Sequence, residues 1–215
     1  MAVRFRTTMR WSSGTVFALA CAAVAAWAFA YLFRDIEAGN ALARRFAESG
    51  LDVPAHFFGG GLALLLAPLQ MSTALRRRWP RLHRIGGGLY AAGVLIAGLA
   101  GLSLARHAQG GLVTGTAFAL LAIAWLATTT TGIVHAVRGG HAAHRRWMWR
   151  SVALTASAVT LRLTLGIGLG VLHLPWAAVY AFAAWSCWTL NLAACELLLR
   201  AFAPTPSRAS AVVAH

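Results

Sequence analysis

Long apolar blocks separated by short arginine-rich breaks constrain this chain more than any other feature. In order, the blocks cover 12–33, 54–75, 85–106, 112–137, 151–174 and 176–202. A helix needs about 20 apolar residues, at about 1.5 Å each, to cross the ~30 Å hydrocarbon core of a bilayer. Each block is long enough to do so. The pattern therefore predicts an all-α integral membrane protein built as a bundle of six transmembrane helices.

The composition supports one membrane domain without a soluble one. The chain is 59% hydrophobic and 11% charged, whereas soluble domains are close to one quarter charged. A single domain is expected over 1–203, followed by a short disordered cytoplasmic tail over 204–215. The polar stretch 34–53 holds four of the five acids. Its middle, 37–46, has the composition of a helix that lies along the membrane surface.

The arginines predict the orientation. All nineteen basic residues are arginines, and the net charge is +14. They flank apolar blocks and do not form the continuous basic face of a nucleic-acid-binding domain, so no nucleic-acid partner is expected. Fourteen fall on the side of the two termini and four on the other side. Because arginine-rich segments stay in the cytoplasm, both termini are expected there, and the expected partners are the lipid bilayer and its anionic headgroups.

Two charged residues fall inside apolar blocks. Arg162 lies within the fifth block, and Glu196 lies in the sixth toward its cytoplasmic end. Charges inside a membrane are costly and usually functional. The alternative is structural, with Arg162 bonding to carbonyl groups, to Asn191 or to a lipid phosphate. Direct pairing of Arg162 with Glu196 is not expected, because the two residues lie at different depths.

Six histidines fall at the ends of the predicted helices. Three lie at the cytoplasmic face (His83, His135 and His144), and three lie at the outer face (His56, His107 and His173). Histidines at matched depth on different helices are what bis-imidazole haem requires. Imidazole also serves zinc, copper and proton relays. His107, His135 and His173 have a further interpretation as helix C-terminal residues, where the dipole favours a cation.

His83 and His144 carry the stronger argument for a site. Both open outward-running helices and both are followed by arginine. A cationic histidine is disfavoured at a helix N-terminus, so a neutral imidazole that ligates or accepts a hydrogen bond is expected. The glycine runs 59–61 and 86–88 lie near His56 and His83. They would admit a planar macrocycle or, as is commoner, a closely packed neighbouring helix.

Several local patterns resemble one known family. They are His56 with the run Leu-Ala-Leu-Leu-Leu-Ala-Pro-Leu-Gln ending at Gln70, then Leu82-His83-Arg84 with Gly87 and Tyr90, then Ala-His-Arg-Arg-Trp-Met-Trp-Arg-Ser over 143–151, and finally Arg162, Asn191 and Glu196. Together they resemble an uncharacterised bacterial membrane protein family, domain of unknown function 2306. The resemblance implies the multi-pass fold and a bacterial inner (cytoplasmic) membrane, and it brings no established activity. The chain departs from the family at 86–88, where glycines replace a basic residue.

The leading hypothesis is a membrane-embedded b-type cytochrome-like or redox protein that binds haem b between helices. His83 and His144 are the expected ligands, with His135 as a substitute, and Arg84, Arg145 and Arg150 would pair with propionates. His56 with His107 or His173 would form any second site, and a redox partner or larger membrane complex would follow.

The competing hypothesis is a non-catalytic membrane subunit or small-molecule-binding membrane protein whose His, Arg and Glu residues are structural. Neither hypothesis settles whether the chain is an enzyme.

Overall fold

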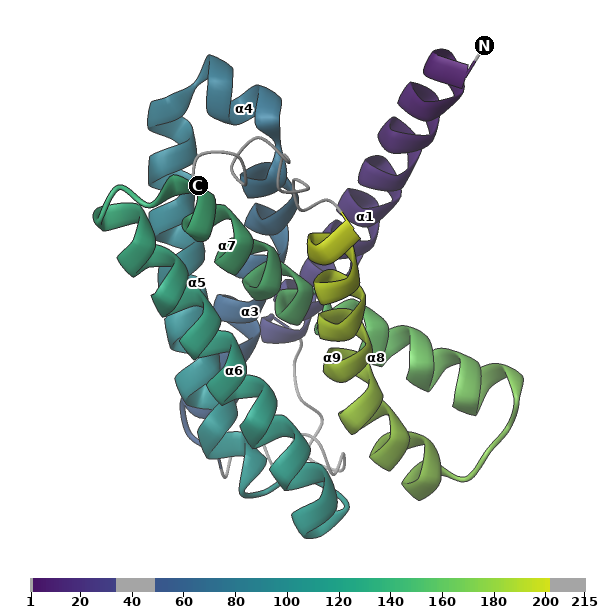
Figure 1. Cartoon of the computed structure of the whole chain (residues 1–215). Helices are drawn as coiled ribbons and strands as arrows, with labels where there is room; N and C mark the ends of the chain where they lie inside the picture. The colour runs from purple at the N-terminus through teal and green to yellow at the C-terminus, as the bar shows by residue number, and fades with distance from the viewer. Residues whose placement is uncertain (1, 34–48, 202–215) are drawn as a thin grey trace, which may run out of the picture.

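The computed structural model describes residues 2–33 and 49–201, and every regular element in these two ranges is helical. Six helical stretches are long and apolar enough to cross a membrane. The elements, shown in Figure 1, are α1 (Ala2–Leu32), α3 (Asp52–Met71), α4 (Thr73–Arg78), α5 (Pro80–Ala105), α6 (Gly111–Val137), α7 (His141–Thr155), α8 (Ser157–Leu165), the π-helix η1 (Gly166–Val171) and α9 (Trp176–Ala201). The predicted six-helix membrane fold is confirmed. The surface helix expected at 37–46 and the tail expected at 204–215 lie outside the described residues.

Several boundaries differ from the prediction, three of them at the second, third and fifth spans. The second span ends at Met71, because Ser72 leaves the helical conformation and caps α4 by accepting a hydrogen bond from the Leu75 N–H at 3.2 Å. The third span begins at Pro80, where proline suits the first helical turn. The fifth span begins at His141 and consists of α7, α8 and η1 in succession. His83 and His144 therefore lie inside their helices and not ahead of them.

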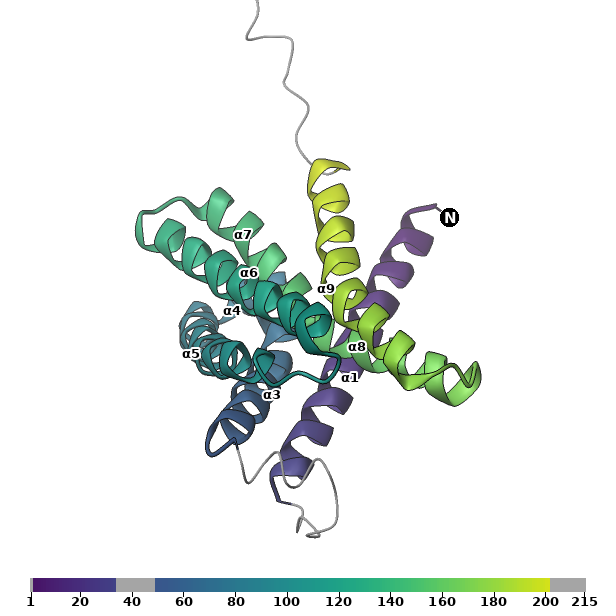
Figure 2. The same cartoon turned by 90° about the horizontal axis from the view of Figure 1, so that it is seen from below.

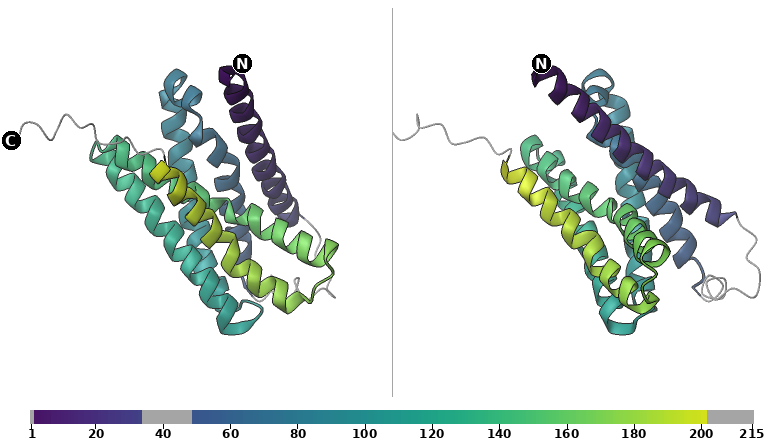
Figure 3. Two further views of the ribbon diagram at one scale, coloured as in Figure 1. Left: turned by 45° about the vertical axis from the view of Figure 1, so that its right-hand side comes forward. Right: turned by 90° about the vertical axis from the view of Figure 1, so that its right-hand side faces the viewer.

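Successive spans alternate in direction, so the start of α1 and the end of α9 lie on the same side of the bundle (Figure 3). We define the arginine-rich face as the side that carries α4, the start of α5, the α6–α7 connection and the start of α7. The other side, with the end of α5 and the start of α6, is the opposite face. Viewed from below, α3, α5, α6 and α7 gather on one side, and α1, α8 and α9 on the other (Figure 2).

The closest helix contact joins α3 and α5 at two glycines. A Cβ atom added to Gly59 would lie 2.6 Å from the Gly93 carbonyl oxygen and 2.9 Å from the Ala97 nitrogen. A Cβ atom added to Gly93 would lie 2.8 Å from the Gly59 carbonyl oxygen. In both cases the added atom would meet backbone atoms of the other helix, which cannot rotate aside as a side chain can. Gly59 therefore contributes to the close packing of small residues that stabilises helix pairs in membranes.

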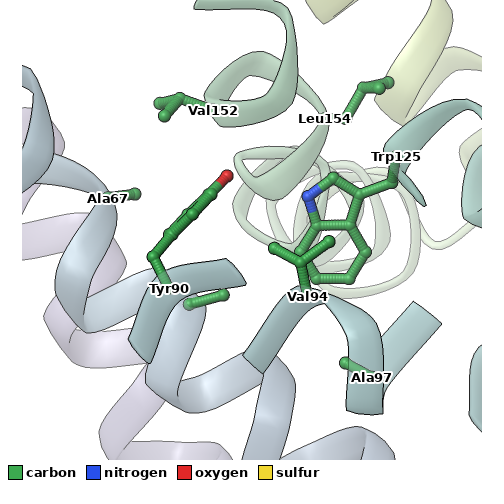
Figure 4. Packing of buried hydrophobic residues seen from close by; sticks show 8 residues of the cluster. Ala67, Tyr90, Val94, Ala97, Trp125, Val152 and Leu154 are labelled. Carbon is green, nitrogen blue, oxygen red and sulfur yellow. The ribbon is translucent and has the colours of Figure 1, made fainter. Parts of the chain in front are cut away.

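The buried core lies between α3, α5, α6 and α7. Tyr90, Val94, Trp125, Val152 and Leu154 are its larger members. The Tyr90 hydroxyl and the Trp125 indole nitrogen both point into the space between α5, α6 and α7 (Figure 4). Many large apolar side chains are instead exposed, including Leu95 and Leu99 on α5 at 54% and 55%. This distribution fits a bundle whose outer surface faces lipid.

Candidate functional site

His83 is held by Gln70, which reaches across from α3. With its amide nitrogen toward α5, Gln70 donates to His83 Nδ1 at 3.0 Å and to the His83 carbonyl at 3.1 Å, and its oxygen accepts from the Gly87 N–H at 3.1 Å. Gly86 and Gly87 leave the space that Gln70 occupies. Because His83 Nδ1 accepts a hydrogen bond, the neutral ring carries its proton on Nε2. Gly86 and Gly87 thus admit a side chain from the neighbouring helix.

His144 has the opposite arrangement. Its Nδ1 lies 2.7 Å from the carbonyl oxygen of Gly132 on α6. A carbonyl oxygen only accepts, so Nδ1 carries the proton, and Nε2 keeps a free lone pair. Gly132 is buried, and a Cβ atom there would lie 2.7 Å from the Met148 sulfur. The close contact of α6 with α7 therefore fixes both the position and the tautomer of His144.

His83 and His144 are each the fourth residue of a helix that begins at the arginine-rich face. Tyr90 on α5 bonds to Ser151 on α7 at 2.7 Å. Each histidine precedes its member of this contact by seven residues, which is nearly two helical turns, or about 10 Å toward the arginine-rich face. Because α5 and α7 run outward from the arginine-rich face in the same direction, both rings lie on that side of the Tyr90–Ser151 contact. That the two histidines share one ligand stays a prediction.

A buried hydroxyl network lies directly beneath the histidine pair. The Tyr90 hydroxyl bonds to Ser151 and to Thr155, each at 2.7 Å. Thr129 bonds to Ser151 at 2.7 Å, and the Trp125 N–H donates to Thr155 at 3.0 Å. Sequence reasoning selected Tyr90 and missed the other four residues. Two features of the sequence could have indicated this network. Ser151 and Thr155 are one helical turn apart at the start of an apolar block, and residues 128–131 of the preceding block are all threonines.

Arg150 and Glu196 form an ion pair that joins α7 to α9. Arg150 Nε and Nη2 donate to the two carboxylate oxygens of Glu196 at 2.5 and 3.0 Å. The Arg150 guanidinium also lies 4.6 Å from the centroid of the Trp147 ring. This bidentate geometry is the strong form of an arginine–carboxylate contact. Arg150 is therefore occupied within the protein, whereas Arg84 and Arg145 are exposed on the arginine-rich face.

The Glu196→Gln variant should be less stable than the wild-type protein by about 1 kcal/mol, because it leaves the half-buried Arg150 without its anion. Thermal unfolding in detergent would measure the loss. Asp52→Asn is the matched control, since Asp52 forms no ion pair with any residue that the structure describes. Equal unfolding temperatures for the two variants would show that the ion pair contributes nothing.

The remaining predicted residues take separate places. Asn191 accepts from Thr160 at 3.0 Å and donates to the Ala153 carbonyl at 3.2 Å, so it links α9 to the fifth span. His135 is half-buried at the end of α6, close to Gly140. His107 and His173 are exposed at the opposite face, and His173 has a left-handed backbone with φ of 51°. His56 and Arg162 lie in the half of the bundle toward the opposite face, away from the His83–His144 pair.

Within the described residues, no group of three or more His, Cys, Asp or Glu side chains could hold a metal ion. Cys21, Cys187 and Cys195 are buried and free. Haem requires only two axial nitrogens, and each must present a lone pair. His144 Nε2 meets this requirement. His83 Nε2 carries a proton as long as Gln70 donates to Nδ1, so these hydrogen bonds favour His144 over His83 as a ligand.

These features define a polytopic helical membrane protein with polar side chains concentrated between α3, α5, α6, α7 and α9. The chain belongs to the family described as "Predicted membrane protein (DUF2306)", whose family model matches residues 53–199. This match confirms the resemblance and contains the whole of the site described above. No curated protein and no solved structure matches the chain.

Proposed function

We propose that this chain is a membrane-embedded small-molecule-binding protein whose ligand is held between His83 and His144. One observation supports the proposal above all: two imidazoles in first helical turns at the arginine-rich face offer opposite hydrogen-bonding groups. His83 Nε2–H donates, and His144 Nε2 accepts. Both rings are half-buried, and neither Nε2 atom is among the buried, unpartnered polar atoms of the described residues. A ligand can therefore reach both nitrogens.

A hydroxyl group on an aromatic ring matches this pair. Its oxygen accepts from His83 Nε2–H, and its proton is donated to the lone pair of His144 Nε2. The site lies within a helix bundle near one membrane face, so its ligand must partition into lipid. A hydroquinone with an alkyl tail has both the aromatic hydroxyl group and the affinity for lipid. Gln70 donates to His83, and His144 donates to the Gly132 carbonyl. These two bonds hold the rings in complementary tautomers before the ligand arrives, which lowers the entropic cost of binding.

Binding of a decyl-chain benzohydroquinone to the purified protein, followed by tryptophan fluorescence quenching, tests this proposal. Saturable binding should weaken at least tenfold in His83→Ala and in His144→Ala, because each variant removes one of the two hydrogen bonds. His141→Ala, an exposed histidine at the start of α7, should bind like the wild type. Absence of saturable binding, or equal affinity in all four proteins, would rule the ligand class out.

Haem is the second candidate, and the His144 geometry favours it. A ligating histidine commonly donates its other N–H to a backbone carbonyl, as His144 does to Gly132. Arg84 and Arg145 would be available for the propionates. In protein expressed with haem supplied, a Soret band that disappears in His144→Ala would support this candidate. Protein without a Soret band that still binds the hydroquinone would support the first.

We also propose a bacterial inner membrane location with both termini in the cytoplasm. The arginine-rich face carries Arg76, Arg77, Arg78, Arg81, Arg84, Arg138, Arg145, Arg146 and Arg150. Arg106 is the arginine at the opposite face among the described residues. Such an imbalance keeps the richer side in the cytoplasm.

A further inference from the structure

Arg162 is a charged side chain within a membrane-spanning helix. It lies in α8, nine residues before the end of η1, or about 13 Å along the fifth span from its outer end. Its side chain is half-buried. A charge at such a depth is costly unless a partner or water compensates it. The contacts of the guanidinium therefore indicate whether the protein itself compensates this charge.

Within residues 2–33 and 49–201, the contacts of Arg162 supply no anion. Arg162 Nη1 donates to the Ala158 carbonyl of its own helix at 2.9 Å, so this bond does not join two helices. The guanidinium carbon lies 4.6 Å from the centroid of the Trp27 ring on α1. Such a cation–π contact contributes about 0.5–2 kcal/mol and supplies no anion. Glu196 is occupied by Arg150, and no carboxylate among the described residues forms an ion pair with Arg162.

His56 lies near the start of α3, in the same half of the bundle as Arg162. Its Nδ1 lies 2.9 Å from the Ala97 carbonyl on α5, so Nδ1 carries the proton and fixes the ring. Its ring also packs against Gly101, where a Cβ atom would lie 3.3 Å from Nδ1. Asp52, one turn away along α3, forms no ion pair with Arg162. Asp52 therefore does not supply the anion that Arg162 requires.

Aromatic rings form an apolar wall beside this charge. Phe57 on α3 lies 5.7 Å from Trp27 and 5.2 Å from Tyr31, measured between ring centroids. Trp27 precedes the end of α1 by five residues, or about 7 Å. A ligand here would have its charged group at Arg162 and its apolar part against Trp27, which is 42% exposed. The arrangement suits an amphiphile, since a free inorganic ion has no apolar part to place there.

We propose that Arg162 binds the carboxylate or phosphate group of an anionic amphiphile between α1, α3 and α8. One guanidinium N–H is bonded to Ala158, and the remaining donors can bind both oxygens of such a group. The ligand could be a membrane lipid or a fatty-acid-like carboxylate, since the two share this chemistry. This site is separate from the His83–His144 pair, and the proposal does not depend on which ligand that pair binds.

Native mass spectrometry of delipidated protein in a neutral detergent tests the site. The probes are phosphatidylglycerol, phosphatidylcholine and decanoate, each titrated separately. Wild-type protein should retain phosphatidylglycerol or decanoate in preference to phosphatidylcholine. Retention of phosphatidylglycerol alone identifies a lipid, and retention of decanoate alone identifies a small carboxylate. The affinity for the retained probe should fall at least tenfold in Arg162→Gln.

Arg106→Gln is the matched control, because Arg106 is exposed at the opposite face and bonds to Ser103 at 2.8 Å. It should bind within twofold of the wild type. Equal binding by wild type and Arg162→Gln would overturn the proposal, as would an equal loss in both variants or no anion preference in the wild type. Should Arg162→Gln fail to fold, the comparison of Arg162→Lys with Arg106→Lys decides. Lysine lacks the bidentate fork, so a threefold or greater loss confined to Arg162→Lys supports the site, and a smaller loss overturns it.

Discussion

The Tyr90→Ala variant should lose about 3–5 kcal/mol of stability, the largest effect expected of any single substitution in this chain. Tyr90 is fully buried at 0% exposure. Its ring fills the core between α3, α5 and α7, and its hydroxyl bonds to both Ser151 and Thr155. Truncation would leave a cavity and remove two hydrogen bonds at once. Unfolding by denaturing detergent, followed by circular dichroism, would measure the loss.

Tyr90→Phe separates the ring from the hydroxyl. It should cost only about 1 kcal/mol, because Ser151 keeps its bond to Thr129 and Thr155 keeps its bond from Trp125. A cost for Tyr90→Phe equal to that of Tyr90→Ala would show that the hydroxyl network dominates the stability of the core. No measurable cost for either variant would show that α5 and α7 do not meet at Tyr90.

The second large effect is expected from Gly59→Ala. A single methyl group at this position meets the Gly93 carbonyl and the Ala97 nitrogen, so α3 and α5 must separate along their contact. Overpacking of this kind costs about 1–3 kcal/mol. The unfolding midpoint in denaturing detergent should fall accordingly. Because Gln70 also joins α3 to α5, its bonds to His83 should weaken, and hydroquinone affinity should fall with them.

Gly60→Ala is the matched control on the next residue of the same helix. A Cβ atom at Gly60 would lie 4.0 Å from the Ala97 Cβ, which is an ordinary contact. This variant should match the wild type or be slightly more stable, since alanine favours the helix. Equal stability of the two variants would contradict the close approach of α3 to α5.

The membrane fold was predictable from hydropathy alone because every crossing segment must satisfy its backbone within itself. The starts of the third and fifth spans were harder to predict. Helical structure continues outside the apolar blocks, into the polar segments that carry His83 and His144. The end of α3 at Met71 depends on the cap that Ser72 gives to α4. Local polar residues set that boundary, and hydropathy does not register it.

The sequence allowed the residues of the site to be predicted, but not the hydrogen bonds and ion pairs that they form. His83, His144, Gln70 and Tyr90 were selected from sequence, yet their partners come from other helices: Gln70 bonds to His83, and Ser151 bonds to Tyr90. Arg150 was expected to bind a propionate, and the structure pairs it with Glu196 instead. Partners on different helices, such as Arg150 and Glu196 at 46 residues apart, depend on which helix faces meet. The spacing of residues along one chain does not contain that information.

The unequal lengths of α3 and α6 have a consequence for the surrounding membrane. α3 has 20 residues and α6 has 27, which correspond to about 30 and 40 Å of helix. Both helices cross the same bilayer, so α6 must tilt by up to about 40° or extend into the headgroups when α3 stands upright. A thicker bilayer would pull Asp52 at one end of α3 and the arginines of α4 at the other toward hydrocarbon. The protein should therefore concentrate in thin regions of a membrane, and the spacing of its two polar faces should track bilayer thickness.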